Sequence, residues 1–137
     1  MAAESLTIDL CSPTQAPIEY TAEEVVLPGS EGVMTVLPGH TFVLTTLKTG
    51  VLIIQNGEEY DFFAVHGGFA EIARDRIKII ADQVEHAENI DKARAEAAKT
   101  RAEDSIAKPT EGHSVEQAEA AMARAIARIQ AHGGEHY

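Results

Sequence analysis

The pattern of hydrophobic and polar residues changes character near residue 87. Up to that point, short runs rich in Val, Ile and Thr are separated by Gly, Pro and Asn, which is typical of β-strands joined by turns. Beyond it, alanine dominates and apolar residues recur every three or four positions, which is typical of helices. The pattern therefore predicts a β-domain over residues 1–86, followed by a helical hairpin over residues 87–137.

The β-domain is predicted to be a sandwich or flattened barrel of eight or more short strands. Residues 6–10 alternate apolar and polar side chains, as a half-buried strand does. Asn56-Gly57 indicates a tight hairpin turn, because both residues tolerate positive φ. Pro28-Gly29 and Pro38-Gly39 are expected to end strands, and residues 13–17 to interrupt them. The other runs expected as strands are residues 24–27, 32–37, 42–47, 50–55, 60–65, 69–73 and 77–81.

Two helices are expected, over residues 89–106 and 114–131, with a break at residues 108–112 that contains Pro109 and Gly112. Asn89 is the expected N-cap of the first helix, and Asp91 is favourable in its first turn. Ser114 and Gln117 form a capping-box pattern at the start of the second helix.

The faces on which these helices are expected to pack consist mostly of alanine. Alanine favours helix formation but buries little apolar area. We therefore expect helices that form readily and dock weakly, so that more than one arrangement of the hairpin is accessible. The expected inner positions are Ile90, Ala93, Ala97, Ala98, Ala102 and Ile106 on the first helix, and Val115, Ala118, Met122, Ala125 and Ile129 on the second.

Charge narrows the range of partners. The formal net charge is −11, and residues 1–86 alone carry 13 acidic and 4 basic residues. Such a domain is unsuited to nucleic acid, whose binding depends on Lys and Arg at the phosphates, and anionic lipid would repel it. No run approaches the ~20 apolar residues that span a bilayer, so any membrane association is expected through a partner. The single cysteine, Cys11, allows no disulfide within the chain.

Two clusters of small residues, at 28–32 and 66–68, are expected to serve turn geometry, because glycine adopts positive φ and lets another backbone approach. A phosphate-binding loop is the alternative, but neither cluster matches a P-loop or a dinucleotide-binding fingerprint. No nucleophile elbow is present either, and we expect no catalysis by this chain alone.

His132 and His136 straddle two glycines and are expected to lie in a frayed tail. Phe62 and Phe63 must face opposite sides of a strand, and one of them is a candidate contact for a partner.

The arginines of the two helices differ in their acidic neighbours. Arg94 lies three residues after Asp91, and Arg101 three before an aspartate, which is a contact spacing on a helix. Arg124 and Arg128 instead form a like-charged pair four residues apart, with no acidic residue within one turn of either. The pair is either solvated or meets an anion, which could be Asp91, another protein's carboxylate or a phosphate ligand.

Taken together, these segments resemble the ε subunit of bacterial F-type ATP synthase, whose mitochondrial counterpart is called δ. The likeness runs essentially from end to end, and the order and spacing of its segments make it specific. The segments that carry it are LPGSEG at residues 27–32, LPGH at 37–40, LTTLKTG at 44–50 and HGGFAEI at 66–72, followed by the helical hairpin.

The resemblance implies a ten-stranded β-sandwich followed by two helices. It also implies a subunit of the central rotor stalk that joins γ to the c-ring, couples proton flow to ATP synthesis and does not catalyse alone. In this family the helices fold onto the sandwich or extend along γ toward the α and β subunits, and the extended form blocks ATP hydrolysis. The implied location is the cytoplasmic face of the bacterial plasma membrane, as a peripheral part of F1. A free-standing nucleotide sensor without a rotor partner is the alternative.

Some members of this family bind ATP in the folded-down hairpin. The resemblance therefore implies ATP as a regulatory ligand, with no cofactor required. The phosphates are expected among the arginines, with Asp91 and Glu85 orienting the arginines or the adenosine. The motif is matched by IDKARA at residues 90–95, and the implied site residues are Glu85, Ile90, Asp91, Arg94, Ala95, Arg101, Arg124 and Arg128.

Overall fold

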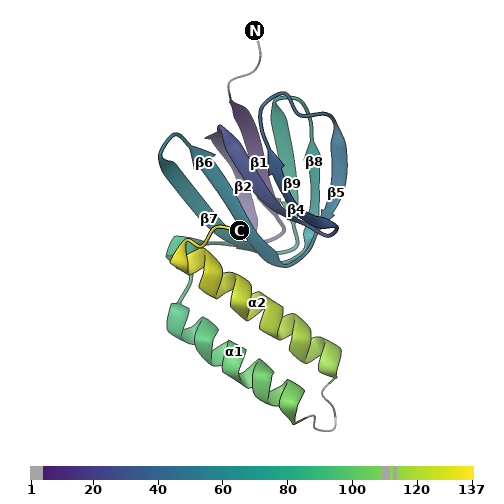
Figure 1. Cartoon of the computed structure of the whole chain (residues 1–137), viewed down its shortest axis with the longest axis vertical. Coiled ribbons are helices and arrows are strands. Elements are labelled where there is room, and N and C mark those ends of the chain that lie inside the picture. The colour runs from purple at the N-terminus through teal and green to yellow at the C-terminus, as the bar shows by residue number, and fades with distance from the viewer. Residues whose placement is uncertain (1–4, 109–111, 113) are drawn as a thin grey trace.

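The computed structural model describes residues 5–108, 112 and 114–137. A β-sandwich forms the N-terminal part, and two antiparallel helices lie below one end of it (Figure 1). The break predicted at residues 108–112 falls largely outside the described residues, since residues 109–111 are not among them. The expected fold class, a β-sandwich followed by a helical hairpin, is confirmed.

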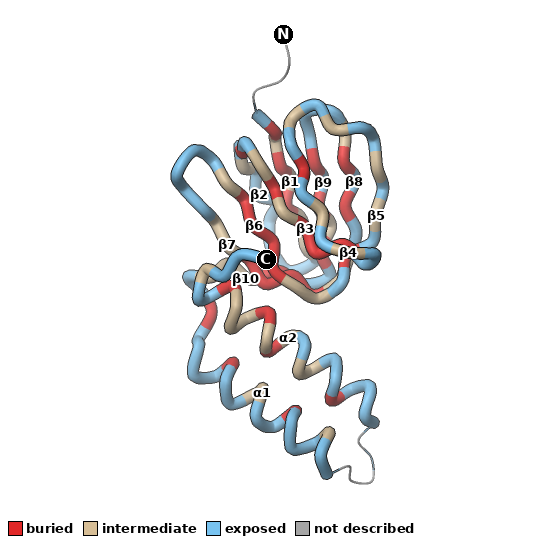
Figure 2. The backbone as a smooth tube through the Cα atoms, in the orientation of Figure 1, coloured by how far each residue is buried: buried red, intermediate tan, exposed pale blue. Residues whose placement is uncertain are grey.

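Ten strands form one continuous sheet in the order β10-β7-β6-β3-β5-β8-β9-β1-β2, with β4 paired to β3. The sheet curls on itself, and Figure 2 shows buried stretches along many of its strands. All pairs are antiparallel except β1 with β9. The strands are β1 Leu6–Ser12, β2 Gln15–Ala22, β3 Glu24–Gly29, β4 Gly32–Val36, β5 Val43–Leu47, β6 Gly50–Asn56, β7 Glu59–Val65, β8 Gly68–Ile72, β9 Arg76–Ala81 and β10 Val84–His86.

Two proline-containing segments differ from the prediction. Residues 13–17 were expected to interrupt the strands, but β2 begins at Gln15 and includes Pro17. β2 pairs only with β1, at the end of the sheet order, where a residue without an N–H is tolerated. β3 also continues through Pro28 to Gly29, which pairs with Gly32 across a tight hairpin. A Cβ on Gly29 would lie 2.6 Å from the Gly32 carbonyl oxygen, so glycine is required there.

The helices begin at residues that cap them. A short 3₁₀ turn, η1 (Ala87–Asn89), precedes α1 (Lys92–Ala107), and the N-cap of α1 is Asp91. The prediction of Asn89 as the N-cap is therefore wrong, because Asn89 ends the 3₁₀ turn. Helix α2 (Val115–Gly133) has Ser114 as its N-cap, as predicted, and Ser114 Oγ accepts from the Gln117 N–H at 3.1 Å.

Helix α2 lies between α1 and the sandwich, and it packs on β6 and β7 (Figure 1). Its buried Ala127 and Ala131 join a second apolar cluster with Val51, Ala64 and Ile90. The remaining buried helix residues are Ala95, Ala102, Ala118 and Ala125. Ala93 and Ala97 are exposed although they were expected to face inward, and Ala95 faces inward instead. Within the described residues, neither helix is long and apolar enough to cross a membrane.

The C-terminal tail is docked on the sandwich, so the predicted frayed tail is wrong. Gly134 ends α2 in a left-handed conformation. The His136 ring then packs edge-on against Tyr60 and Phe62, with centroid distances of 5.0 and 5.4 Å. The Tyr137 hydroxyl accepts from the Val51 N–H at 2.7 Å and donates to the Val51 carbonyl at 2.6 Å.

Phe62 and Phe63 face opposite sides of β7, as the alternation predicts. Phe63 is buried in the sandwich core, whereas Phe62 is partly buried outside it. In this arrangement the chain's own tail contacts Phe62 through the His136 ring. Phe62 is thus a contact of the docked hairpin here.

Candidate functional site

A cavity of about 440 Å³ lies where the end of the sandwich meets the two helices. Strand β10 and η1 form one side of it, α1 another, and α2 closes it through one side chain. Every predicted site residue except Arg124 lines this cavity, together with Gln83, Asn89 and Ala98. The volume lies within the usual range of small-molecule sites, about 300–1,000 Å³.

Helix α1 places two guanidinium groups at the cavity. Arg94 and Arg101 are seven residues apart, which is close to two helical turns, so they share one face. Asp91 caps the helix by accepting the Arg94 N–H at 3.1 Å through Oδ1. Neither arginine forms an ion pair within the described residues, so the side-chain pairing suggested by sequence spacing is absent there.

Arg128 reaches the same cavity from α2 and meets a carboxylate. Its Nε donates to Glu85 Oε1 at 2.7 Å, and both side chains are about three-quarters buried. Of the alternatives left open for the arginine pair, a carboxylate of the chain's own is the one observed for Arg128. That carboxylate is Glu85 on β10, whereas Asp91 is engaged in capping α1. Arg124, one turn earlier, is half-buried and has no ion-pair partner in the described part of the chain.

Glu85 Oε1 also accepts a hydrogen bond from His66 Nε2 at 2.8 Å. Burial tends to raise the pKa of Glu85, but the hydrogen bonds from Arg128 and His66 hold that pKa below its usual value. Burial lowers the pKa of His66, and the nearby Arg128 acts in the same direction, so the hydrogen bond to Glu85 does not restore it. At neutral pH the contact therefore joins a neutral imidazole to a carboxylate.

The arrangement suits a polyanion more than a neutral ligand. Three guanidinium groups, from Arg94, Arg101 and Arg128, converge on one polar cavity, and guanidinium binds phosphate oxygens in a bidentate manner. Ile90 and Ala95 add a small apolar wall of the kind that an adenine or ribose can contact. Among the described residues, no cluster of His, Cys, Asp and Glu could hold a metal ion.

Sequence reasoning missed His66 and Gln83 as neighbours of the site. His66 was placed in a turn, and nothing in linear spacing connects it to a carboxylate 19 positions later. Pairing of β10 with β7 brings the two together, because Glu85 lies opposite Ala64, next to that turn. Gln83 precedes β10, and its carbonyl accepts the His66 N–H at 2.9 Å.

Two family models match the chain. The model of the ATP synthase delta/epsilon chain beta-sandwich domain matches residues 5–87. The model of the ATP synthase delta/epsilon chain long alpha-helix domain matches residues 88–133. The two matches follow one another and together span nearly the whole sequence.

Curated relatives align over nearly their full length. The ATP synthase epsilon chain of Desulforamulus reducens is 38% identical over 129 residues, which cover 94% of this chain and 98% of the relative. The ATP synthase epsilon chain of Cyanothece is 35% identical over 133 residues, covering 95% of this chain and 96% of the relative. The corresponding protein of Desulforapulum autotrophicum is 39% identical over 129 residues, covering 93% and 95%.

Solved structures share the fold. A chain of the Euglena gracilis mitochondrial ATP synthase matches with a TM-score of 0.79 at 23% identity, covering 90% of this chain and 78% of that chain. A chain from the central stalk and c-ring structure of the Tetrahymena thermophila mitochondrial ATP synthase matches with a TM-score of 0.56 at 14% identity, covering 98% of each. At these identities the likeness concerns the fold alone.

Proposed function

The chain belongs to the ATP synthase delta/epsilon chain family, and on that premise we propose that it works in the central stalk and regulates the enzyme through its helical hairpin. It is a non-catalytic subunit of the ATP synthase complex. The β-sandwich is the part that joins the rotor, linking γ to the c-ring and so coupling proton flow to ATP synthesis. A free-standing nucleotide sensor is not favoured, because both halves of the chain match this family.

The partners are γ and the c-ring, and the α and β subunits when the helices extend. The chain is part of the F1 sector. Its curated relatives include bacterial proteins, which align with it over nearly their full length. We place it at the cytoplasmic face of the bacterial plasma membrane, held there through the complex. Copurification tests the rotor role: full-length tagged chain is expected to retain γ from a lysate of its host, and its recovery without γ would overturn that role.

ATP is the proposed regulatory ligand of the hairpin. The observation that carries this is the cavity where Arg94, Arg101 and Arg128 converge. Because its walls come from β10, α1 and α2, the cavity is complete only while the hairpin is docked. A ligand that binds only the docked form stabilises it by RT ln(1 + [L]/Kd), about 2.7 kcal/mol at a hundred times Kd. Falling ATP would then free the helices to extend and inhibit hydrolysis.

Calorimetric titration of the full-length chain with ATP, with and without magnesium, tests this site. Binding is expected, and Arg94→Ala and Arg101→Ala are each expected to weaken it about tenfold, the loss of one charge-assisted hydrogen bond. Neither side chain belongs to an ion pair in the described residues, so the fold is expected to survive. Arg74→Ala removes an exposed guanidinium outside the cavity and serves as the matched control. Equal affinities for all four proteins would contradict the site.

A further inference from the structure

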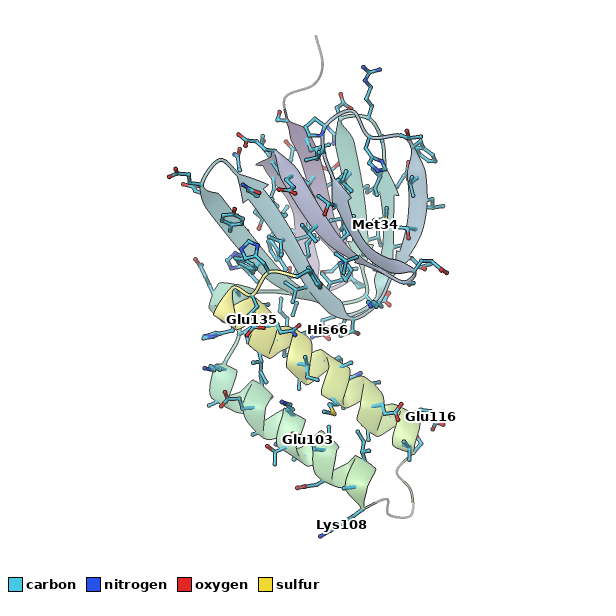
Figure 3. The ribbon with its side chains drawn as sticks, viewed as in Figure 1. Met34, His66, Glu103, Lys108, Glu116 and Glu135 are labelled. Atoms are coloured by element: carbon cyan, nitrogen blue, oxygen red, sulfur yellow. The ribbon has the colours of Figure 1, made fainter. Side chains whose placement is uncertain are left out.

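The segment His66-Gly67-Gly68 forms the turn between β7 and β8, and its histidine lies in an unusual environment. His66 follows β7 and faces the helices at the base of the sandwich (Figure 3). It is 7% exposed, and among the described residues it is the only polar or charged residue that is buried. Burying a polar group is unfavourable unless it is hydrogen-bonded, and Glu85 supplies the hydrogen bond of His66.

Two side chains donate to one oxygen of Glu85. His66 Nε2 lies 2.8 Å from Oε1 and Arg128 Nε lies 2.7 Å from the same atom. The histidine belongs to the sandwich and the arginine to α2, so the carboxylate joins the two parts of the molecule. A single contact from Arg128 would leave the carboxylate free to rotate with the long arginine side chain. The second donor, in the turn between β7 and β8, defines where the carboxylate lies.

The protonation state of His66 follows from its neighbours. An ionised carboxylate only accepts, so Nε2 must carry the hydrogen. Burial, together with Arg128 and Arg124, lowers the pKa of His66, and Glu85 is the one acidic group that opposes this. The imidazole is therefore neutral at neutral pH. Nδ1 is buried without a partner in the described residues, and protonation would place an unpaired N–H there.

The glycines that follow explain how the turn holds this histidine. Gly67 and Gly68 have φ values of 81° and 125°, which residues other than glycine rarely adopt. A Cβ on Gly68 would lie 2.2 Å from the Ile80 carbonyl oxygen. The Gly67 carbonyl accepts the Asp82 N–H at 3.1 Å, and the His66 N–H donates to Gln83 at 2.9 Å. The turn is thereby fastened to the segment that leads into β10.

We propose that His66 is a positioning residue of the nucleotide site, holding the Glu85 carboxylate so that it orients Arg128 toward the cavity. The inference rests on the proposed ATP binding. His66 itself is not among the residues that line the cavity, and it acts only through Glu85. Its neutrality matters, because a donor without charge steers the carboxylate while leaving its negative charge to act on Arg128.

Two substitutions separate this role from simple packing. His66→Gln keeps an N–H donor at nearly the position of Nε2 and removes titration near neutral pH, whereas His66→Ala removes the donor. At pH 7.5, His66→Ala is expected to weaken ATP binding by the full-length chain about tenfold, and His66→Gln to bind within about threefold of the wild type. His40→Ala, at a partly exposed histidine that does not line the cavity, is the control. Wild-type affinity in His66→Ala, or equal losses in both variants, would overturn the proposal.

Acidification supplies a second readout that packing would not produce. Between pH 7.5 and 5.8, the wild type is expected to lose affinity relative to His66→Gln, because a protonated His66 neutralises the Glu85 carboxylate and so weakens its hold on Arg128. The same comparison cancels the titration of ATP itself, which affects both proteins alike. Parallel pH profiles for the two proteins would contradict the assignment.

An observation without ligand distinguishes failure of this inference from failure of the ATP site. The Arg128 Nε–H resonance in NMR spectra is expected to exchange slowly in the wild type and in His66→Gln, and about tenfold faster in His66→Ala. If the wild type binds no ATP, the proposed ligand is wrong, and this resonance alone decides whether His66 holds Glu85. Unchanged exchange in His66→Ala would overturn the positioning role whatever the outcome with ATP.

Discussion

The sandwich and the helical hairpin bury different kinds of side chain. The sandwich core contains large aliphatic and aromatic residues, among them Phe63, Leu52 and Ile72. The residues that α1 and α2 bury are all alanine. Each buried methylene contributes about 0.8 kcal/mol, so a leucine or phenylalanine contributes far more than an alanine does. The sandwich therefore has its own large core, whereas the hairpin docks through a small apolar cluster and a few polar contacts.

Those contacts lie at two places. Arg128 meets Glu85 at the cavity, and Glu85 also accepts a hydrogen bond from His66. Tyr137 meets Val51 beyond the end of α2. Val51 lies where β3 has separated from β6, since β3 pairs with β6 only between Ile53 and Gln55. A single tyrosine hydroxyl satisfies both backbone groups that this separation leaves open. Polar contacts of this kind can be broken without unfolding the sandwich.

The largest expected effect that tests the difference between the sandwich and the hairpin is a loss of stability in the sandwich core. Phe63→Ala should lower the free energy of unfolding by about 3–5 kcal/mol, because it removes a fully buried aromatic ring. Ile129→Ala, at a half-buried position of α2, should leave the main transition nearly unchanged. Urea unfolding followed by circular dichroism measures both. Losses of similar size would mean that the hairpin and the sandwich share one cooperative core.

The next largest effect concerns the central contact. Arg128→Leu should weaken docking by about 1–2 kcal/mol, because it leaves a largely buried carboxylate with one donor fewer. Amide exchange in α2 is expected to accelerate about tenfold, while β1 and β9 keep their protection. Arg124→Leu is the control one turn away, and it has no ion pair in the described residues to lose. Equal acceleration of amide exchange in both variants would contradict a role of the Arg128–Glu85 contact in docking.

A smaller effect is expected at the C-terminal tail. Tyr137→Phe removes both hydrogen bonds to Val51 and should weaken docking by about 1 kcal/mol, with about fivefold faster amide exchange in the last turn of α2. Tyr60→Phe removes the same chemical group from a residue whose hydroxyl has no hydrogen bond among the described residues. That variant should exchange like the wild type. If the two variants behave alike, the tail does not hold the hairpin.

The smallest effect is that of mild acid. In the docked state, burial together with Arg128 and Arg124 lowers the pKa of His66 below 6.5, and release of α2 removes both arginines, so the released state binds more protons as pH falls below that value. Docking stability is therefore present above pH 6.5 and declines below it. The lowered pKa of Glu85 adds a second loss, which begins only below its unfolded value of 4.5. Amide chemical shifts of α2, followed from pH 7.5 to 5.5, should move toward the released state, and an unchanged spectrum would contradict this sign.

Local chemistry made much of the architecture predictable. Alternation along residues 6–10, the Asn56-Gly57 turn and the Ser114 cap each depend on side chains close in sequence, and each is present in the structure. The predictions that failed depended on surroundings. Pro17 lies in a strand because that strand is at the edge of the sheet. Asp91, and not Asn89, is the N-cap of α1, because Asn89 belongs to the 3₁₀ turn that precedes the helix.

The candidate site shows the same division. The family motif identified Glu85, Arg94, Arg101 and Arg128 by position, and the structure brings them to one cavity. The sequence could not show that Arg128 meets Glu85, because they are 43 positions apart. It also left Arg124 equivalent to Arg128, although only Arg128 lines the cavity.

The sequence by itself determined the two-part organisation, the alanine character of the hairpin and the family to which the chain belongs. These follow from periodicity, composition and motifs, which are properties of neighbouring residues. Only the tertiary structure decided which distant groups form hydrogen bonds with one another: Glu85 with His66 and Arg128, and Val51 with Tyr137. Such pairs join residues from different elements, and their geometry is set by how a curled sheet and a docked helix meet.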